Sequence, residues 1–328
     1  MLKRTLWNGQ DVPALGLGCW AIGGPFFAGD QSLGWGTVDD SESIRAIHAA
    51  YDMGIRFFDT SDAYGAGHSE EILGKALKDR PDAVIATKFG NTYDRVSRQL
   101  TGLDVSSGYI RHALDASLSR LGRNRVNLYQ LHVDTLGNEA GEVHDCLIGL
   151  ADEGWIEAFG WSTDSVVQAS RWPESPRYAA IQHGLNVVSP AAELLALCKE
   201  THRISINRSP LAMGVLTAKF DTPKSMAKDD IRASPPGWLK YFNDGRPDPT
   251  MAEKVKAVGE LLRSGGRTLA QGALAWIWAQ SPQTLPIPGF RTVAQVSENV
   301  RALDYGPLPQ DVVAEIRQLL SRFAPDLN

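Results

Sequence analysis

The sequence has little that points to a secreted, membrane-bound or nucleic-acid-binding protein. It holds three cysteines among 328 residues, Cys19, Cys146 and Cys198, and their wide spacing forms no CxxC pair and no metal-ligand cluster. No run approaches the roughly 18–20 apolar residues of a membrane span, and the N-terminus turns polar before a signal-peptide core. A net charge of −5 leaves no basic excess for phosphate backbones. We expect a cytoplasmic protein that binds neither membranes nor nucleic acids.

Strand-like and helix-like runs alternate along the chain. Eight apolar runs predict strands, at 14–18, 55–59, 83–88, 126–132, 156–161, 178–182, 203–207 and 284–288. Amphipathic runs between them predict helices, at 41–53, 69–78, 107–121, 143–153, 164–170, 191–201 and 269–280. This alternation is typical of parallel βαβ units. Eight such units favour a closed (β/α)8 TIM barrel over an open doubly wound sheet, and we expect one domain over 1–328.

Three segments do not follow this alternation of strands and helices. Residues 2–6 and 12–13 flank Asn8-Gly9, a pair typical of tight hairpin turns, so we expect a hairpin that plugs the bottom of the barrel. The segments 22–38 and 212–250 are long for connections in a compact domain. Their aromatic residues favour lids over a pocket, although packing on the barrel surface is the alternative.

Polar residues stand at or just past the ends of three predicted strands. Asp59, Lys88 and His132 end the second, third and fourth strands, and Tyr64 follows in the turn after Asp59. Because residues two apart in a strand share a face, the odd-numbered residues of 55–59 face one way. We expect the terminal polar residues to point into the top of the barrel, where barrel enzymes place their active sites.

Together these four side chains suit proton donation to a carbonyl group. A free tyrosine has a pKa near 10 and is a poor acid at neutral pH. The Lys88 ammonium is expected to lower the pKa of Tyr64, while Asp59 keeps Lys88 charged. His132 is suited to orienting a substrate oxygen. The hydride must come from a cofactor, because side chains supply none. Taken singly, each residue is more often structural, so the joint pattern carries the prediction.

Two segments after the last two strands offer a phosphate site. Gly16-Leu17-Gly18 resembles part of a dinucleotide fingerprint, but no helix opens directly after it, which excludes a Rossmann site. The run 207–214 follows the seventh strand and lies near Lys219 in sequence. The run 286–291 follows the eighth and leads to a helix. Barrel phosphate sites commonly lie after these two strands, beside a helix N-terminus.

In order and spacing these motifs resemble the aldo-keto reductase superfamily, from residue 15 to about residue 304. The matching segments are FFDTSDAYG at 57–65, SEEILG at 69–74, ATK at 86–88, YQLH at 129–132, SPLAMGVLTAK at 209–219, and IPG at 287–289 with the pair at 298–299. The resemblance implies a barrel that binds NADPH, with NADH less favoured. It also implies reduction of an aldehyde or ketone, or oxidation of a small-molecule alcohol.

The resemblance assigns roles to individual residues. It implies Tyr64 as general acid, Lys88 lowering its pKa, Asp59 supporting Lys88, and His132 orienting the carbonyl. The cofactor would contact Trp20, Asp59, Ser162, Thr163, Gln182, Arg208, Ser209, Pro210, Leu211, Ala212, Gly214, Lys219, Gly289, Arg291, Gln295, Glu298 and Asn299. Ser162 and Gln182 match positions for the nicotinamide amide, the run 209–219 matches the pyrophosphate loop, and 289–299 matches the adenosine end.

Other functions stay open. The superfamily includes potassium-channel β subunits, so a regulatory module that binds NADPH is one alternative, and an NAD-linked sugar or alcohol dehydrogenase is another. A metal-dependent barrel hydrolase lacks ligands, since His112, His132 and His144 show no metal-site spacing. Aromatic residues in the long segments suit a flat or ring-bearing carbonyl compound or a sugar. No motif indicates an oligomeric state.

Overall fold

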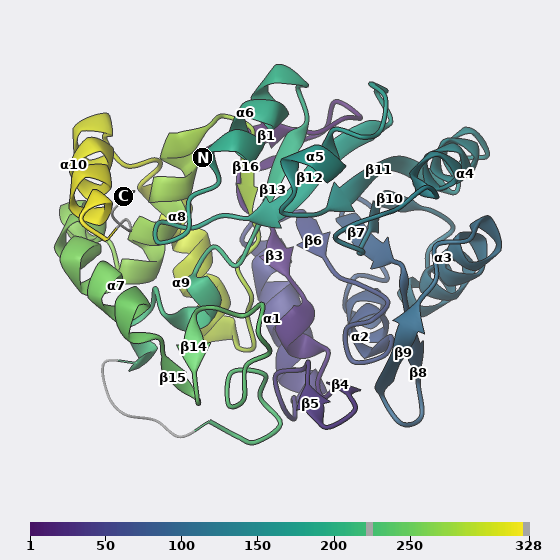
Figure 1. Ribbon diagram of the computed structural model, residues 1–328, viewed down its shortest axis with the longest axis horizontal. Helices are drawn as coiled ribbons and strands as arrows, with labels where there is room; N and C mark the ends of the chain where they lie inside the picture. The colour runs from purple at the N-terminus through teal and green to yellow at the C-terminus, as the bar shows by residue number, and fades with distance from the viewer. Residues whose placement is uncertain (221–225, 324–328) are drawn as a thin grey trace.

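The computed structural model describes residues 1–220 and 226–323, and its centre is a parallel barrel (Figure 1). Eight strands are hydrogen-bonded in the order β16-β13-β12-β11-β10-β7-β6-β3. They are β3 (Leu17–Gly18), β6 (Phe57–Asp59), β7 (Val84–Phe89), β10 (Val126–Leu131), β11 (Ile156–Ser162), β12 (Tyr178–Gly184), β13 (Ile204–Arg208) and β16 (Thr284–Pro286). A parallel bridge between Gly18 and Gly289 brings the first and last strands together. The predicted TIM barrel is confirmed.

Glycine makes this closure possible. The backbone N–H of Gly16 donates to the carbonyl of Pro286 at 3.0 Å, and that of Gly18 to the carbonyl of Pro288 at 3.1 Å. A Cβ atom on Gly18 would lie 2.8 Å from the carbonyl oxygen of Ile287. Because backbone cannot yield as a flexible side chain does, the close approach of β3 to the β16 end depends on a residue without a side chain.

Helices surround the strands. Seven match predicted helices: α1 (Asp40–Asp52), α2 (His68–Ala76), α3 (Ser107–Leu121), α4 (Ala140–Asp152), α5 (Val166–Ala169), α6 (Ala192–Glu200) and α8 (Leu269–Gln280). The helix expected after 286–291 is α9 (Val293–Arg301). Two helices were not predicted, α7 (Pro249–Leu262) and α10 (Gln310–Ser321), and they pack against each other at the edge of the barrel (Figure 1).

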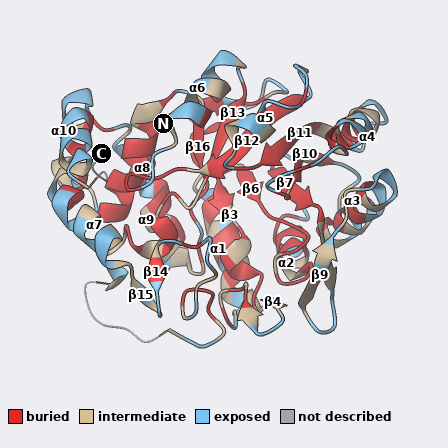
Figure 2. Cartoon of the chain, in the orientation of Figure 1, coloured by how far each residue is buried: buried red, intermediate tan, exposed pale blue. Residues whose placement is uncertain are grey.

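The barrel interior is filled by one apolar cluster. Its members are Leu6, Val12, Phe57, Val84, Ala86, Leu128, Ala158, Ala179, Ala180, Ile204, Ile206, Leu285 and Ile287. Leu6 and Val12 come from the hairpin of β1 (Lys3–Thr5) and β2 (Asp11–Pro13), which confirms the predicted plug. Figure 2 shows buried residues concentrated in the central strands and on the helix faces that cover them.

Ile55 is an exception to the predicted strand face. It belongs to the outer core between strands and helices, not to the interior cluster. The reason is local: β6 begins only at Phe57, and the N–H of Ile55 still bonds to the carbonyl of Ala50 as the chain leaves α1. The alternation therefore applies from Phe57 onwards.

The two long segments contact each other. The first contains β4 (Phe27–Ala28) and β5 (Gln31–Ser32), which join β8 (Asn91–Asp94) and β9 (Gln99–Leu103) in a four-stranded sheet that was not predicted. The second contains a short hairpin of β14 (Phe242–Asn243) and β15 (Arg246–Pro247); its residues 221–225 lie outside the described residues. An antiparallel bridge between Trp35 and Asp230 links the two segments.

The cysteines and the helices of the described residues bear on two expectations from the sequence. Cys19, Cys146 and Cys198 are all free and buried, as predicted. Among the described helices, none combines the length and apolar character needed to cross a bilayer.

Candidate active site

Lys88 is the centre of a buried polar cluster at the end of β7. Its side chain has no solvent exposure. The ammonium donates to Oδ1 of Asp59 at 2.6 Å and to the carbonyl oxygen of Thr60 at 2.7 Å. Its third contact is the hydroxyl of Tyr64, at 3.2 Å. Three partners match the three N–H groups of an ammonium, so the buried charge is fully satisfied.

Asp59 ties this cluster to two further strands. Its second oxygen, Oδ2, accepts from Nε2 of Gln130 at 3.1 Å and from Nε2 of Gln182 at 2.8 Å. Burial acts to lower the pKa of Lys88, but the charges of Asp59 and of a Tyr64 phenolate act more strongly the other way. The pKa of Lys88 therefore lies above its ordinary value, and the side chain is a permanent cation at neutral pH.

Tyr64 lies between this cation and an imidazole. The Tyr64 and His132 rings meet edge to face, with centroids 5.9 Å apart and an angle of 86°. His132 directly follows β10, and its backbone N–H donates to the carbonyl of Phe89 at 2.8 Å. The structure thus brings together Asp59, Tyr64, Lys88 and His132, which the sequence places on three strand ends and one turn.

Tryptophans line one side of Tyr64. Trp20 stacks on the Tyr64 ring at 5.9 Å and 24°. Trp35 meets Trp20 edge-on at 5.5 Å, and Trp238 lies 6.4 Å from Trp20. Trp238 is 60% exposed, so it forms the outer edge of this aromatic group. The two long segments supply Trp35 and Trp238 to this aromatic group.

Burial sets the titration of the two candidate acid–base groups. Burial raises the pKa of Tyr64 above its ordinary value, and the nearby Lys88 charge opposes that shift without cancelling it. Lys88 does lower the pKa of Tyr64, as expected, but desolvation raises that pKa by more. Burial, then the charges of Lys88 and Arg208, hold the pKa of His132 well below its usual range. Tyr64 is thus a phenol and His132 a neutral imidazole at neutral pH.

The predicted nicotinamide-binding residues lie beside the cluster. Ser162 and Gln182 are register partners at the ends of β11 and β12. Thr163 is fully buried, and its hydroxyl lies 2.9 Å from both the carbonyl and a carboxylate oxygen of Asp134, so its hydrogen bonds are already used within the chain. Arg208 pairs with a carboxylate, Asp164, at 2.6 Å.

The predicted pyrophosphate loop is a tight turn after β13. Ser209, Ala212 and Met213 all have positive φ angles. The N–H of Ala212 bonds to the carbonyl of Ser209, and that of Gly214 to the carbonyl of Leu211, each at 2.9 Å. Pro210 is buried within this turn, and Lys219 is exposed shortly after it. Such turns orient backbone N–H groups in ways that suit anions.

The predicted adenosine-binding residues lie on α9 and in the segment just before it. Arg291 donates from Nη1 to the carbonyl of Trp35 at 3.0 Å and from Nη2 to the carbonyl of Thr37. Its backbone N–H donates to Oε1 of Gln295 at 2.7 Å. Glu298 and Asn299 lie on α9, and Gly289 lies at the barrel closure next to Gly18. Arg291 therefore connects α9 to the first long segment.

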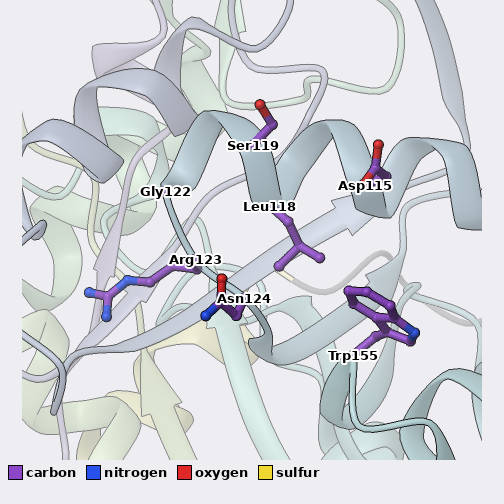
Figure 3. A pocket seen from close by; sticks show the side chains of 7 residues that line it. All are labelled: Asp115, Leu118, Ser119, Gly122, Arg123, Asn124 and Trp155. Carbon is purple, nitrogen blue, oxygen red and sulfur yellow. The ribbon is translucent and has the colours of Figure 1, made fainter.

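A separate hollow of about 560 Å³ lies at the opposite end of the barrel strands. Its lining comprises Asp115, Leu118, Ser119, Gly122, Arg123, Asn124 and Trp155 (Figure 3). Asn124 precedes β10 and Trp155 precedes β11, whereas His132 follows β10. The hollow is therefore not part of the site around Lys88. Within residues 1–220 and 226–323, no three His, Cys, Asp or Glu side chains gather as a possible metal site.

Sequence reasoning missed three polar contributors to the site. Gln130 bonds to Asp59, and the Ser61 hydroxyl lies 3.2 Å from Nδ1 of His132 and 3.0 Å from Asp62. A signal existed for Gln130, which is two residues before His132 and so shares its strand face. Ser61 and Asp62 are in a turn, where no periodicity indicates direction.

Comparison with known proteins gives the family. Residues 14–321 match the model of the aldo/keto reductase family. A relative from Schizosaccharomyces pombe, "Aldo-keto reductase yakc [NADP(+)]", is 30% identical over 96% of this chain and 90% of its own length. The chain belongs to the aldo/keto reductase family and is an oxidoreductase.

Solved structures agree. The glycerol dehydrogenase of Gluconobacter oxydans superposes with a TM-score of 0.83 at 29% identity, covering 99% of this chain and 97% of that one. An aldo/keto reductase from Klebsiella pneumoniae, solved with NADP and acetate, shares the fold with a TM-score of 0.71 at 22% identity, over 99% of this chain and 96% of that one.

Proposed function

We propose that the protein is an NADP(H)-dependent oxidoreductase that reduces an aldehyde or ketone to an alcohol, or runs the reverse reaction. The observation that carries this proposal is the Lys88 ammonium, which contacts both Asp59 Oδ1 and the Tyr64 hydroxyl. Family membership supports the reaction class, and the NADP(+) in the name of the yeast relative supports the cofactor.

The residues present suit NADP(H). Arg291 offers a cation beside the N-terminus of α9, a combination that favours phosphate. The positive-φ turn at Ser209 and Ala212 suits the pyrophosphate. Ser162 and Gln182 would hold the nicotinamide amide next to Asp59. When bound, the cofactor supplies the hydride.

Tyr64 is proposed to give its proton to the carbonyl oxygen. Lys88 stabilises the phenolate that results, and Asp59 holds Lys88 in place through the 2.6 Å contact. His132, neutral and edge-on to Tyr64, is proposed to contact the same substrate oxygen, and its distance from Tyr64 supports this role. Trp20 and Trp238 provide an apolar wall suited to a flat carbonyl compound or to one face of a sugar.

The direct test is reduction of a panel of aldehydes and ketones with NADPH, followed by its absorbance. The Tyr64→Phe variant should lose about 10²–10⁴-fold in turnover, since it lacks the donor hydroxyl, while its NADPH binding, measured by tryptophan quenching, stays intact. Tyr305→Phe serves as the control, because Tyr305 is 41% exposed and its hydroxyl donates to the Gly266 carbonyl, away from the cluster around Lys88. Full turnover in Tyr64→Phe would refute the assignment.

Alcohol oxidation is the second candidate direction. The similarity to a glycerol dehydrogenase favours it, at 29% identity over nearly the whole chain. Initial rates with NADP⁺ or NAD⁺ and a series of polyols, set against the NADPH rates, decide between the directions. Faster turnover with NAD⁺ than with NADP⁺ would contradict the proposed cofactor.

A further inference from the structure

The Ser61 hydroxyl connects His132 to a buried acid. Its oxygen lies 3.2 Å from Nδ1 of His132 and 3.0 Å from Oδ1 of Asp62. The backbone N–H of Ala63 also donates to it, at 3.2 Å. Ser61 has no solvent exposure and Asp62 has 1%. No bulk water is therefore needed to link the carboxyl group to the imidazole.

The number of available hydrogens allows two arrangements of the hydrogen bonds that join Asp62, Ser61 and His132. A serine hydroxyl has one hydrogen to donate and two lone pairs to accept with, and Ala63 occupies one lone pair. Of Asp62 and His132, one must receive the hydroxyl hydrogen and the other must donate to the remaining lone pair. An ionised Asp62 can only accept, so Nδ1 of His132 must then carry a proton. A protonated Asp62 donates to Ser61, which donates to a bare Nδ1.

We propose that Ser61 and Asp62 are positioning residues that determine which ring nitrogen of His132 carries the proton. While Asp62 holds its proton, Nε2 of His132 carries N–H and donates to a substrate carbonyl oxygen. When Asp62 releases its proton to solvent, the Ser61 hydroxyl turns to the carboxylate. The imidazole then exchanges its Nε2 proton for one on Nδ1 through solvent and stays neutral throughout. Nε2 becomes an acceptor, which suits an alcohol.

The surroundings of Asp62 favour its protonated form. Oδ2 is buried without a hydrogen-bond partner, and no cation of the described residues lies within ion-pairing distance of the carboxyl. Glu70 on α2 is the nearby anion, and Arg120 on α3 opposes it while paired to Glu70 at 2.7 Å. Burial first, and then Glu70, raise the pKa of Asp62 to about 8.

The other ionisable groups around Asp62, Ser61 and His132 stay neutral or keep a constant charge. Three tyrosines from β8, α3 and β10 are close enough for Asp62 to affect them, and burial raises the pKa of each: Tyr93, Tyr109 and Tyr129. On the imidazole side, the cations are Lys88 on β7 and Arg208 on β13. Both disfavour a doubly protonated His132. Over the pH range of interest, Asp62 is therefore the group that changes charge.

Nε2 of His132 is available for the substrate. In the described part of the chain its only side-chain hydrogen bond is the one from Nδ1 to Ser61. The catalytic consequence rests on the proposed function, whereas the tautomer of His132 can be measured without any turnover. The two are therefore tested separately.

The first experiment is long-range ¹H–¹⁵N NMR of the full chain with ¹⁵N-labelled histidine, which distinguishes Nε2–H from Nδ1–H. His132 is identified from the spectrum of a His132→Gln sample. We expect the Nε2–H form at about pH 6.5 and the Nδ1–H form at about pH 9.5, on either side of the Asp62 titration. In Asp62→Asn the side chain no longer titrates, so His132 should keep a single tautomer at both pH values. The same tautomer at both pH values in the unmodified protein would overturn the proposal.

The second experiment is the pH profile of kcat/KM for carbonyl reduction. In the unmodified protein it should fall about tenfold per pH unit above the pKa of Asp62, and Asp62→Asn should remove that alkaline limb. Asp115→Asn removes an exposed carboxylate on α3 and should keep the limb. Ser61→Ala breaks the connection between Asp62 and His132. In this variant neither the His132 tautomer nor kcat/KM should follow the ionisation of Asp62. A limb retained in Asp62→Asn would also refute the proposal.

Discussion

Lys88 and Asp59 form an ion pair of 2.6 Å whose side chains are 0% and 2% exposed. They come from neighbouring strands, β7 and β6, at the end where the candidate active site lies. The contact has two roles: it keeps the Lys88 ammonium charged beside Tyr64, and it joins two neighbouring strands of the barrel. Removing either partner leaves a buried charge without compensation.

Lys88→Met should therefore destabilise the fold as well as abolish turnover. We expect a loss of about 3–5 kcal/mol in the free energy of unfolding, the cost of an unpaired buried carboxylate. Urea denaturation followed by circular dichroism measures it. The double variant Lys88→Met/Asp59→Asn should be more stable than Lys88→Met alone, because no buried charge is left. Additive losses would contradict this explanation, and Lys75→Met, at an exposed position on α2, serves as the control.

Arg291→Met should weaken NADPH binding far more than NADH binding. Loss of a charge-assisted hydrogen bond to the 2′-phosphate corresponds to roughly 10- to 100-fold in Kd. Tryptophan quenching with each cofactor measures the difference. Arg301→Met removes the same charge at the exposed end of α9 and should change neither affinity. An equal loss for NADPH and NADH would mean that Arg291 acts only through its bonds to the carbonyls of Trp35 and Thr37.

Gly18→Ala should open the barrel closure. The added methyl group would lie 2.8 Å from the Ile287 carbonyl oxygen, so β3 must move away from the β16 end. Overpacking of this kind costs about 1–3 kcal/mol. Gly141→Ala is the matched control, because nothing lies within 4 Å of its Cβ position in α4. Thermal unfolding of both variants gives the comparison, and equal melting temperatures would count against a tight closure.

His183 should make the fold less stable in acid. It is buried on β12, its Nε2 lies 2.8 Å from the Ser205 hydroxyl, and burial lowers its pKa to about 4. The unfolded chain takes up a proton below about pH 6.5 while the folded one does not, so stability is present above that pH and is lost as pH falls towards 4. From about pH 7.5 to about pH 5 we expect this residue to contribute a loss of roughly 2 kcal/mol.

Comparison of variants isolates that contribution. His183→Asn keeps an amide N–H for the Gly184 carbonyl but does not titrate, so urea denaturation at the two pH values should show a smaller acid-induced loss. His112→Asn, at an exposed position on α3, should behave like the unmodified protein. An unchanged acid-induced loss in His183→Asn would exclude His183 as its source.

The barrel was predictable because its strands repeat a simple pattern. Apolar runs that end in polar residues gave both the strands and the inward face, as Val84, Ala86 and Lys88 show. The hairpin of β8 and β9 was not predictable in this way. Its first strand, Asn91–Asp94, has no fully buried residue, so its sequence shows no alternation of apolar and polar residues. α10 buries only Val313 and Ile316 and follows no strand.

The site was predictable where strands determine it. Asp59, Lys88 and His132 end strands whose order along the chain is their order in space. Ser61 and Asp62 were missed because the direction of a turn side chain depends on what the fold places opposite it, here His132 just after β10. The contact of Arg291 with the Trp35 carbonyl was missed for a similar reason, since it joins segments from opposite ends of the chain.

The meeting of Gly18 with Gly289 has a consequence for synthesis on the ribosome. β3 is among the first strands to be made. One of its two adjacent strands is β6, and the other is β16, the last strand of the barrel. Until the chain has been translated through Gly289, one edge of the nascent sheet keeps its backbone N–H and C=O groups unpaired, and such edges are where chains associate wrongly. The hairpin of β1 and β2 covers only the bottom of the barrel, so the edge of β3 stays open to such association until the last strand is made.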